Sequence, residues 1–275
     1  MNYMVDKEWL LKLLNRHDVR IADCRFALGN PEKGQHEYNT SHIPGAVYFD
    51  LEKDLSGCVR EHGGRHPLPD MEEFIDKLGK AGINEKVTIV AYDNGEGAFA
   101  ARFWWMLSYL GHEKVYVLNG GYKEWTSSNY PTTTEVPAFE KTPFNKTIQH
   151  HLLADVNEVR EIASGANTNA LLIDSREQKR YLGIEEPVDK KKGHIPKAVN
   201  KPWMEGLADG RYKTADEQSQ RFSDIDRYKQ LVVYCGSGVT AAPNFLALKE
   251  AGFDDVKLYL GSFSDWISYE DHEIE

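Results

Sequence analysis

The sequence repeats itself, and this repetition constrains the fold more than any other feature. Four blocks of the first half return, in the same order, in the second half. The pairs are IADCR (21–25) with LIDSR (172–176), SHIPGAV (41–47) with GHIPKAV (193–199), VTIVAYDNGEG (87–97) with QLVVYCGSGV (230–239), and GHEKVYVLNGGYKEW (111–125) with GFDDVKLYLGSFSDW (252–266). Repetition on this scale predicts a duplicated domain.

We therefore predict two domains of the same fold, residues 1–135 and 148–275, joined by a linker at 136–147. A stretch rich in Thr and Pro, TTTEVPAFEKTP (132–143), marks the linker region. In each half, short apolar runs alternate with helical patterns, which is typical of parallel strands covered by helices on both faces. The expected fold class is α/β, with two tandem, mostly parallel sheets flanked by helices.

Composition limits the classes of partner. The formal net charge of −10 argues against nucleic acid and anionic membranes as partners. No apolar run approaches the ~20 residues of a membrane-spanning helix. Three cysteines, Cys24, Cys58 and Cys235, show no C-x-x-C spacing, which favours a reducing compartment over a disulfide framework. The cytoplasm is the expected location.

The segment YCGSGVTAAPNF places Cys235 directly after an apolar run and before a helical pattern. In parallel sheets, functional residues gather at the carboxyl ends of strands. The free amides and the dipole of a helix N-terminus favour an anion, and the thiolate is the nucleophilic form of cysteine. The small residues Gly236, Ser237 and Gly238 allow the loop to curl around the sulfur. We predict that Cys235 is a nucleophile rather than an inert core cysteine.

The first half provides an internal comparison, because Asp93 stands where Cys235 stands in the second. The first domain is therefore predicted to be catalytically silent. It also carries a longer connection, DLSGCVREHGGRHPLPD (54–70), which we expect to reach the site of the other half. His62 and His66 lie four residues apart, but Gly63, Gly64 and Pro67 make that segment a poor helix, so no metal site is predicted.

These motifs resemble those of two-domain rhodanese-type sulfurtransferases over essentially the whole chain. The resemblance rests on the paired H-I-P-x-A-V segments, HGGRHPLPD, the D-S-R run, CGSGVTA and the terminal GSFSDW. Within that family, CGSGVTA is similar to the active loop of 3-mercaptopyruvate sulfurtransferases. Thiosulfate sulfurtransferases of this build carry a more basic loop, from which this sequence departs. The resemblance implies no cofactor.

The resemblance also implies roles for individual residues. Cys235 attacks the sulfur of a small-molecule donor and becomes a persulfide, which passes sulfur to a thioredoxin-like protein, a small thiol or cyanide. His66 matches a histidine that pairs with the loop serine, here Ser237, to protonate the leaving enolate. Asp50, Glu52 and Asp54 are all candidates for the carboxylate that orients His66.

The remaining predicted site residues bind the donor or the persulfide. Amides of the loop, including those of Gly236, Gly238, Val239 and Thr240, are expected to stabilise the sulfur anion. Arg180 and Arg176, in the run DSREQKR, are candidates for a clamp on the donor carboxylate, because guanidinium matches carboxylate in a bidentate fork. Arg25 matches Arg176 in the silent half, which favours a structural role for Arg176. Arg65 is a further candidate for holding the donor.

The neutral loop favours mercaptopyruvate over thiosulfate, whose two charges benefit from cations beside the nucleophile. A thiosulfate:cyanide sulfurtransferase is the alternative. A phosphatase with a C-x5-R loop is disfavoured because Ala241, not arginine, is the sixth residue after Cys235. A non-catalytic binding module remains a remote alternative, which the intact cysteine argues against.

Overall fold

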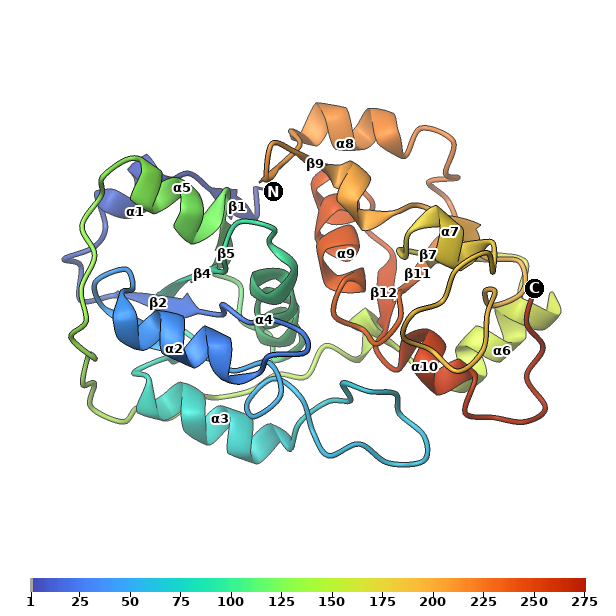
Figure 1. Cartoon of the computed structure of the whole chain (residues 1–275), viewed down its shortest axis with the longest axis horizontal. Helices are drawn as coiled ribbons and strands as arrows, with labels where there is room; N and C mark the ends of the chain where they lie inside the picture. The colour runs from blue at the N-terminus through green and yellow to red at the C-terminus, as the bar shows by residue number, and fades with distance from the viewer. Residues whose placement is uncertain (1) are drawn as a thin grey trace.

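The computed structural model describes residues 2–275 and shows two α/β domains lying side by side (Figure 1). Each domain contains a five-stranded sheet, in the order β1-β5-β4-β2-β3 in the first and β6-β12-β11-β7-β8 in the second. Every neighbouring pair in both sheets is parallel. The predicted fold class, tandem parallel sheets flanked by helices, is confirmed.

The first domain alternates strands and helices along the chain. Its strands are β1 (Met4–Val5), β2 (Val19–Asp23), β3 (Ala46–Tyr48), β4 (Thr88–Tyr92) and β5 (Val115–Leu118). Its helices are α1 (Lys7–Leu11), α2 (Glu32–Thr40), α3 (Met71–Lys80), α4 (Ala98–Tyr109) and α5 (Gly121–Ser127).

The second domain repeats this plan and adds a small hairpin, β9–β10. Its strands are β6 (Leu153–Ala154), β7 (Ala170–Asp174), β8 (Val199–Asn200), β9 (Leu207–Ala208), β10 (Arg211–Tyr212), β11 (Gln230–Tyr234) and β12 (Val256–Tyr259). Its helices are η1 (His150–Leu152), α6 (Val156–Ser164), α7 (Gln178–Tyr181), η2 (Trp203–Gly206), α8 (Ala215–Arg221), α9 (Ala241–Glu250) and α10 (Ser262–Trp266).

The two sheets are equivalent in register as well as in order. β2 pairs with β4 over its whole length, and β7 pairs with β11 in the same way. The central apolar residues of these strands are buried on both faces of each sheet, as the continuous apolar runs indicated. This pairing brings the residues that follow β4 and β11 to the carboxyl edge of each sheet.

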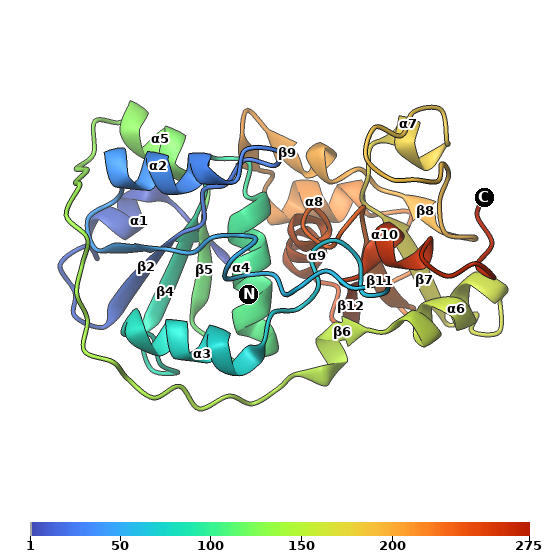
Figure 2. The ribbon, with the colours of Figure 1, turned by 60° about the horizontal axis from the view of Figure 1, so that its bottom comes forward.

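The chain between the two sheets follows the outside of the first domain (Figure 2). Residues 134–149 contain no helix or strand, and the predicted linker 136–147 lies inside this stretch. The amide of Thr142 donates to the carbonyl oxygen of Gly79 at 3.1 Å, which attaches the segment to the end of α3.

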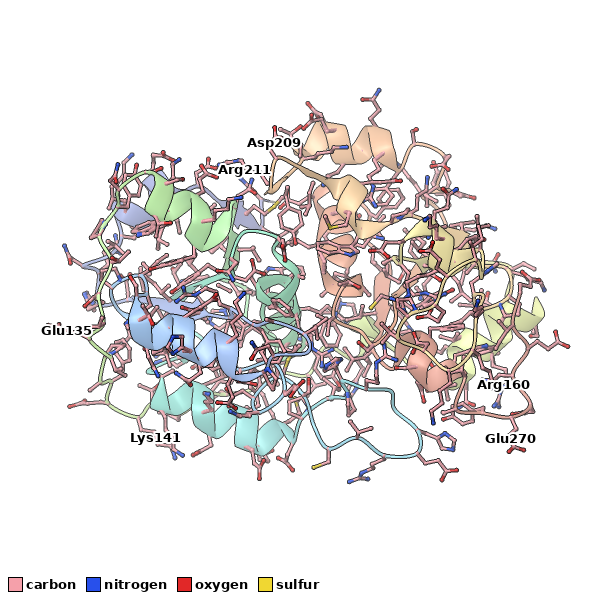
Figure 3. The ribbon with its side chains drawn as sticks, viewed as in Figure 1. Glu135, Lys141, Arg160, Asp209, Arg211 and Glu270 are labelled. Carbon is pink, nitrogen blue, oxygen red and sulfur yellow. The ribbon has the colours of Figure 1, made fainter. Side chains whose placement is uncertain are left out.

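Helix α4 of the first domain packs against α9 of the second at the interface between the domains. Each domain also extends one segment onto the other. Hairpin β9–β10 reaches the first domain, and the Tyr212 hydroxyl donates to the Gly97 carbonyl oxygen at 3.1 Å. Arg211, near the top of Figure 3, forms an ion pair with Asp6 at 2.7 Å and another with Glu124. Two parallel-sheet domains are therefore held in one arrangement by polar contacts as well as by helix packing.

The long loop 54–70 crosses in the opposite direction, towards α10 (Figures 1 and 2). Its Gly63 amide donates to Asp265 Oδ1 at 2.7 Å, and its Arg65 amide donates to Ser264 Oγ at 3.2 Å. The expectation that this loop reaches the other half is confirmed by these contacts. Among residues 2–275, no helix is both long enough and apolar enough to cross a membrane.

Candidate active site

Cys235 lies at the carboxyl end of β11 and is only 1% exposed. The amide of Gly238 donates to its Sγ at 3.1 Å, so the loop curls back over the sulfur. Gly238 has a φ of +78°, and a Cβ there would lie 2.1 Å from the Leu260 carbonyl oxygen. Glycine is therefore needed for the loop to close in this way.

Ser262, at the start of α10, fixes Cys235 from the opposite side. Its Oγ accepts a hydrogen bond from the Cys235 amide at 3.1 Å and lies 3.9 Å from Sγ. Ser262 has a φ of 57°, a conformation that costs a non-glycine residue about 1 kcal/mol or more. Sequence analysis missed Ser262. Gly121 adopts the same backbone conformation in the matching place of the first domain, and only the structure shows that the serine hydroxyl in the second domain contacts Cys235.

His66, from the crossing loop, meets Ser237 of the active loop. A hydrogen bond of 2.8 Å joins His66 Nδ1 and Ser237 Oγ. Burial lowers the pKa of His66 to about 4, and the positive charges of Arg102 and Arg65 act in the same direction. The imidazole is therefore neutral at pH 7 and can accept a proton.

Two of the three candidate carboxylates for orienting His66, those of Asp50 and Asp54, have other partners. Asp50 Oδ1 accepts the amides of Glu52 and Lys53 at 2.8 and 3.0 Å. Asp54 accepts the Asp50 amide and pairs with Lys77. Within residues 2–275, none of the three forms a hydrogen bond with His66, and the charges that act on its pKa are those of Arg102 and Arg65.

Arg102, on α4 of the first domain, is a fully buried cation that sequence analysis missed. It donates to the carbonyl oxygens of Leu55, His66 and Gly238 at 2.9, 3.1 and 3.2 Å, so it ties the crossing loop to the active loop. Burial lowers the pKa of Arg102 to about 9, while the charge of Cys235 acts in the opposite direction. The sequence did contain a signal for Arg102, since it is the only charged residue in the apolar helix AFAARFWWMLSY. A charge buried in such a helix requires a polar partner.

Arg65 and Arg180 approach the active loop from different domains. A Cβ added to Gly236 would lie 3.1 Å from Nη2 of Arg65 and 3.4 Å from Nη2 of Arg180. The neutral loop therefore has two guanidinium groups beside it. Both groups contact the carboxylate of Asp189, and Arg180 also pairs with Glu186 at 2.7 Å.

Arg176 lies deeper in the second domain. Its side chain is 1% exposed and pairs with Asp174 at 2.6 Å. Arg25 in the first domain pairs with Asp23 at the same distance. Because the first domain keeps the same pair, we propose that Arg176 supports the framework of its domain.

The remaining predicted residues surround the loop or lie away from it. Val239 is buried, and Thr240 precedes α9 as its N-cap residue. Cys24 is buried in the first domain, where burial raises its pKa well above the ordinary value, and Cys58 is exposed. Among residues 2–275, no group of three or more His, Cys, Asp or Glu side chains is arranged to hold a metal ion.

Comparison with known proteins assigns the chain to a family. The family model described as the rhodanese-like domain matches twice, at residues 6–128 and 155–269. The chain therefore belongs to the rhodanese-like family and contains two copies of its domain.

Full-length relatives narrow this class to sulfurtransferases. The chain is 40% identical over 271 residues to a probable 3-mercaptopyruvate sulfurtransferase of Pseudomonas aeruginosa, covering 96% of this chain and 95% of the relative. It is 34% identical to the thiosulfate sulfurtransferase of Rattus norvegicus, covering 96% and 91%. The crystal structure of SseA from Escherichia coli, described as a 3-mercaptopyruvate sulfotransferase, is similar to this chain with a TM-score of 0.85 at 33% identity. The match covers 96% of this chain and all of SseA.

Proposed function

We propose that this protein is a sulfurtransferase that takes sulfur from 3-mercaptopyruvate through a persulfide on Cys235. The observation that carries the proposal is the Ser237–His66 hydrogen bond of 2.8 Å beside the buried cysteine. A donor that leaves as an enolate needs a proton relay at this point, whereas sulfite leaves thiosulfate without one. The relatives named as 3-mercaptopyruvate sulfurtransferases support the same donor.

In the first half-reaction the Cys235 thiolate attacks the thiol sulfur of the donor. A sulfur–sulfur bond forms, the carbon–sulfur bond breaks, and its electron pair passes to carbon as the enolate of pyruvate. The thiol proton of the donor moves through Ser237 and neutral His66 to the enolate. The products are pyruvate and the Cys235 persulfide anion, with the proton and charge conserved.

The persulfide anion needs hydrogen-bond donors, which the active loop supplies. The Gly238 amide already donates to Sγ. The amides of Ser237, Val239 and Thr240 donate to no protein acceptor within residues 2–275, so they are free to bind a second sulfur atom. In the second half-reaction, a thiol or cyanide takes the outer sulfur and restores the Cys235 thiolate.

Thiosulfate is the second candidate donor. Arg65 and Arg180 place positive charge beside Gly236, which favours a dianion more than the neutral loop sequence suggested. Asp189 and Glu186 already pair with these arginines, however, so the resting site has no net positive charge that would favour a dianion over a monocarboxylate. The Ser237–His66 pair, which only an enolate leaving group needs, therefore favours mercaptopyruvate. We also propose a cytoplasmic location and a thioredoxin-like protein or small thiol as acceptor, from the cysteine pattern and the persulfide chemistry.

Initial rates with the two donors test the proposal. We expect kcat/KM for 3-mercaptopyruvate to exceed that for thiosulfate by at least about tenfold, or ~1.4 kcal/mol. The Cys235→Ser variant, assayed with both donors, corrects for uncatalysed transfer. A higher kcat/KM for thiosulfate would overturn the donor assignment while leaving the sulfurtransferase class in place.

A further inference from the structure

The carboxylate of Asp189 bridges the two arginines beside the active loop. One of its oxygens contacts Arg65 of the first domain, and the other accepts from Nη2 of Arg180 at 2.8 Å. The Asp189 side chain is fully buried, whereas the side chains of Arg65 and Arg180 remain 34% and 16% exposed. The carboxylate therefore lies inside a fork whose outer edges face solvent.

This fork adjoins the reacting sulfur. A Cβ on Gly236, the residue after Cys235, would lie 3.5 Å from Asp189 Oδ2 and within 3.4 Å of both guanidinium groups. An α-keto acid whose sulfur reaches Cys235 needs a partner for its carboxylate beside the active loop, and Arg65 and Arg180 are the guanidinium groups there. In the resting structure, the Asp189 carboxylate already occupies that position.

We propose that Asp189 is a built-in competitor of the donor, and that binding exchanges its carboxylate for that of the incoming α-keto acid. This proposal rests on the donor class assigned above. The exchange keeps the charge of the fork constant, because one carboxylate replaces another between Arg65 and Arg180. It also makes Asp189 a specificity-determining residue, because an anion without a carboxylate-like pair of oxygens replaces it poorly.

The segment around Asp189 has further contacts that hold its fold when the Asp189 carboxylate moves away from the arginines. Glu186 anchors the turn, since its Oε1 accepts the amides of Val188 and Asp189 at 3.0 and 2.9 Å as well as the Arg180 guanidinium. Lys190, Lys191 and Lys192 follow directly and are exposed. A released Asp189 carboxylate therefore moves into water beside three cations, while Glu186 keeps Arg180 in place.

Pyruvate, which carries the carboxylate but no sulfur to transfer, is the probe of the exchange. Its dissociation constant is measured by titration calorimetry on the full chain, for the wild type and for Asp189→Asn. Removing the competing charge is expected to lower this constant by about tenfold or more. The matched control is Glu185→Gln, which removes one charge from the same segment at an exposed residue that pairs with Lys179, and it should leave the constant within twofold.

Steady-state kinetics provide the second readout. In Asp189→Asn, KM for 3-mercaptopyruvate should fall in parallel with the pyruvate constant, while kcat stays within about twofold. If Asp189 instead holds the arginines in a productive position, its loss will weaken pyruvate binding, and the proposal is wrong. Asp189→Ala, with melting temperatures for both variants, separates a folding defect from an effect on binding.

The calorimetric arm is independent of turnover, so the two proposals can fail separately. Absent turnover of mercaptopyruvate, with tighter pyruvate binding in Asp189→Asn, would overturn the proposed function and keep the exchange. Turnover of mercaptopyruvate with unchanged or weaker pyruvate binding in the variant would overturn the exchange alone. If pyruvate binds neither the wild type nor Asp189→Asn at millimolar concentration, the exchange is also overturned.

Discussion

The loops after β4 and β11 occupy the same position in their domains but differ in how their amides contact the side chain at the strand end. In the first domain, Asp93 fills its own loop. Its two oxygens accept the amides of Gly95, Gly97, Phe99 and Ala100 at 2.9–3.2 Å. In the second domain, Cys235 accepts a single amide, that of Gly238. The loop of residues 236–240 is also one residue longer than the loop of residues 94–97.

This difference shows how one fold supports either a closed loop or a reactive one. Burial raises the pKa of Asp93, but four amide hydrogen bonds oppose that effect and hold the carboxylate in place. The same kind of loop around a thiol leaves amides for the second sulfur of a persulfide. Both domains therefore have an anion-binding loop at the same point of the fold, and the two loops differ in the side chain that enters the loop and in length by one residue.

The largest expected effect comes from making the two loops alike. Cys235→Asp should abolish transfer, with a loss of at least about 10⁴-fold, because no nucleophilic sulfur remains. Its melting temperature should equal or exceed that of the wild type, since a carboxylate at this position accepts loop amides as Asp93 does. Activity assays, mass spectrometry for one added sulfur atom, and thermal melting check these outcomes.

The matched control for that variant is Cys58→Ser, which removes an exposed thiol and should keep full activity. A persulfide detected on Cys24 or Cys58 of the Cys235→Asp protein would contradict the assignment of the nucleophile. A large fall in melting temperature would show that the two loops are not equivalent anion sites.

A second difference is that the active loop is covered by a histidine from the other domain. The pKa of His66 lies at about 4 in the folded protein, against an ordinary value of about 6.5. Between these values the unfolded chain binds a proton that the native protein does not, so stability falls as the pH falls from 6.5 to 4. The full difference is about 3 kcal/mol of unfolding free energy.

Urea unfolding of the wild type and of His66→Gln, at pH 7 and at pH 4.5, measures this dependence. The wild type should lose most of that ~3 kcal/mol relative to the variant, which has no group titrating at this position. Parallel losses in the two proteins would refute the shifted pKa. The acid limb of kcat/KM that belongs to His66 should likewise lie near pH 4 rather than near 6.5.

Much of this comparison could be predicted from the sequence, because the repeats are local patterns. Apolar runs ending in Asp93 and Cys235 placed both loops at strand ends, and the extra length of residues 54–70 indicated a segment that crosses. Asp189 could not be predicted in the same way. In the sequence it precedes three lysines, a pattern typical of an exposed basic surface, and only the fold brings its carboxylate between Arg65 and Arg180.

Arg102 was also missed, and for a related reason. The charge pattern of α4 marks it as unusual, but its effect on the active loop depends on the packing of α4 against α9. No ion pair joins Arg102 to an acidic side chain within residues 2–275 of the structure. Its neighbours are carbonyl oxygens and the active loop. The first domain therefore contributes a buried positive charge beside the active loop of the second.

The smallest expected effect tests this contribution of the first domain. Arg102→Met should slow the alkylation of Cys235 by iodoacetamide at pH 7 by about tenfold, or ~1.4 kcal/mol. Arg102 holds the Gly238 carbonyl oxygen beside the crossing loop, and the Gly238 amide donates to the reacting sulfur. Arg102→Lys should keep most of the rate, and Arg160→Met, which removes one charge from α6, should leave it unchanged. An unchanged rate in a folded Arg102→Met protein would contradict the prediction, since a purely structural arginine would alter melting without altering the reactivity of the cysteine.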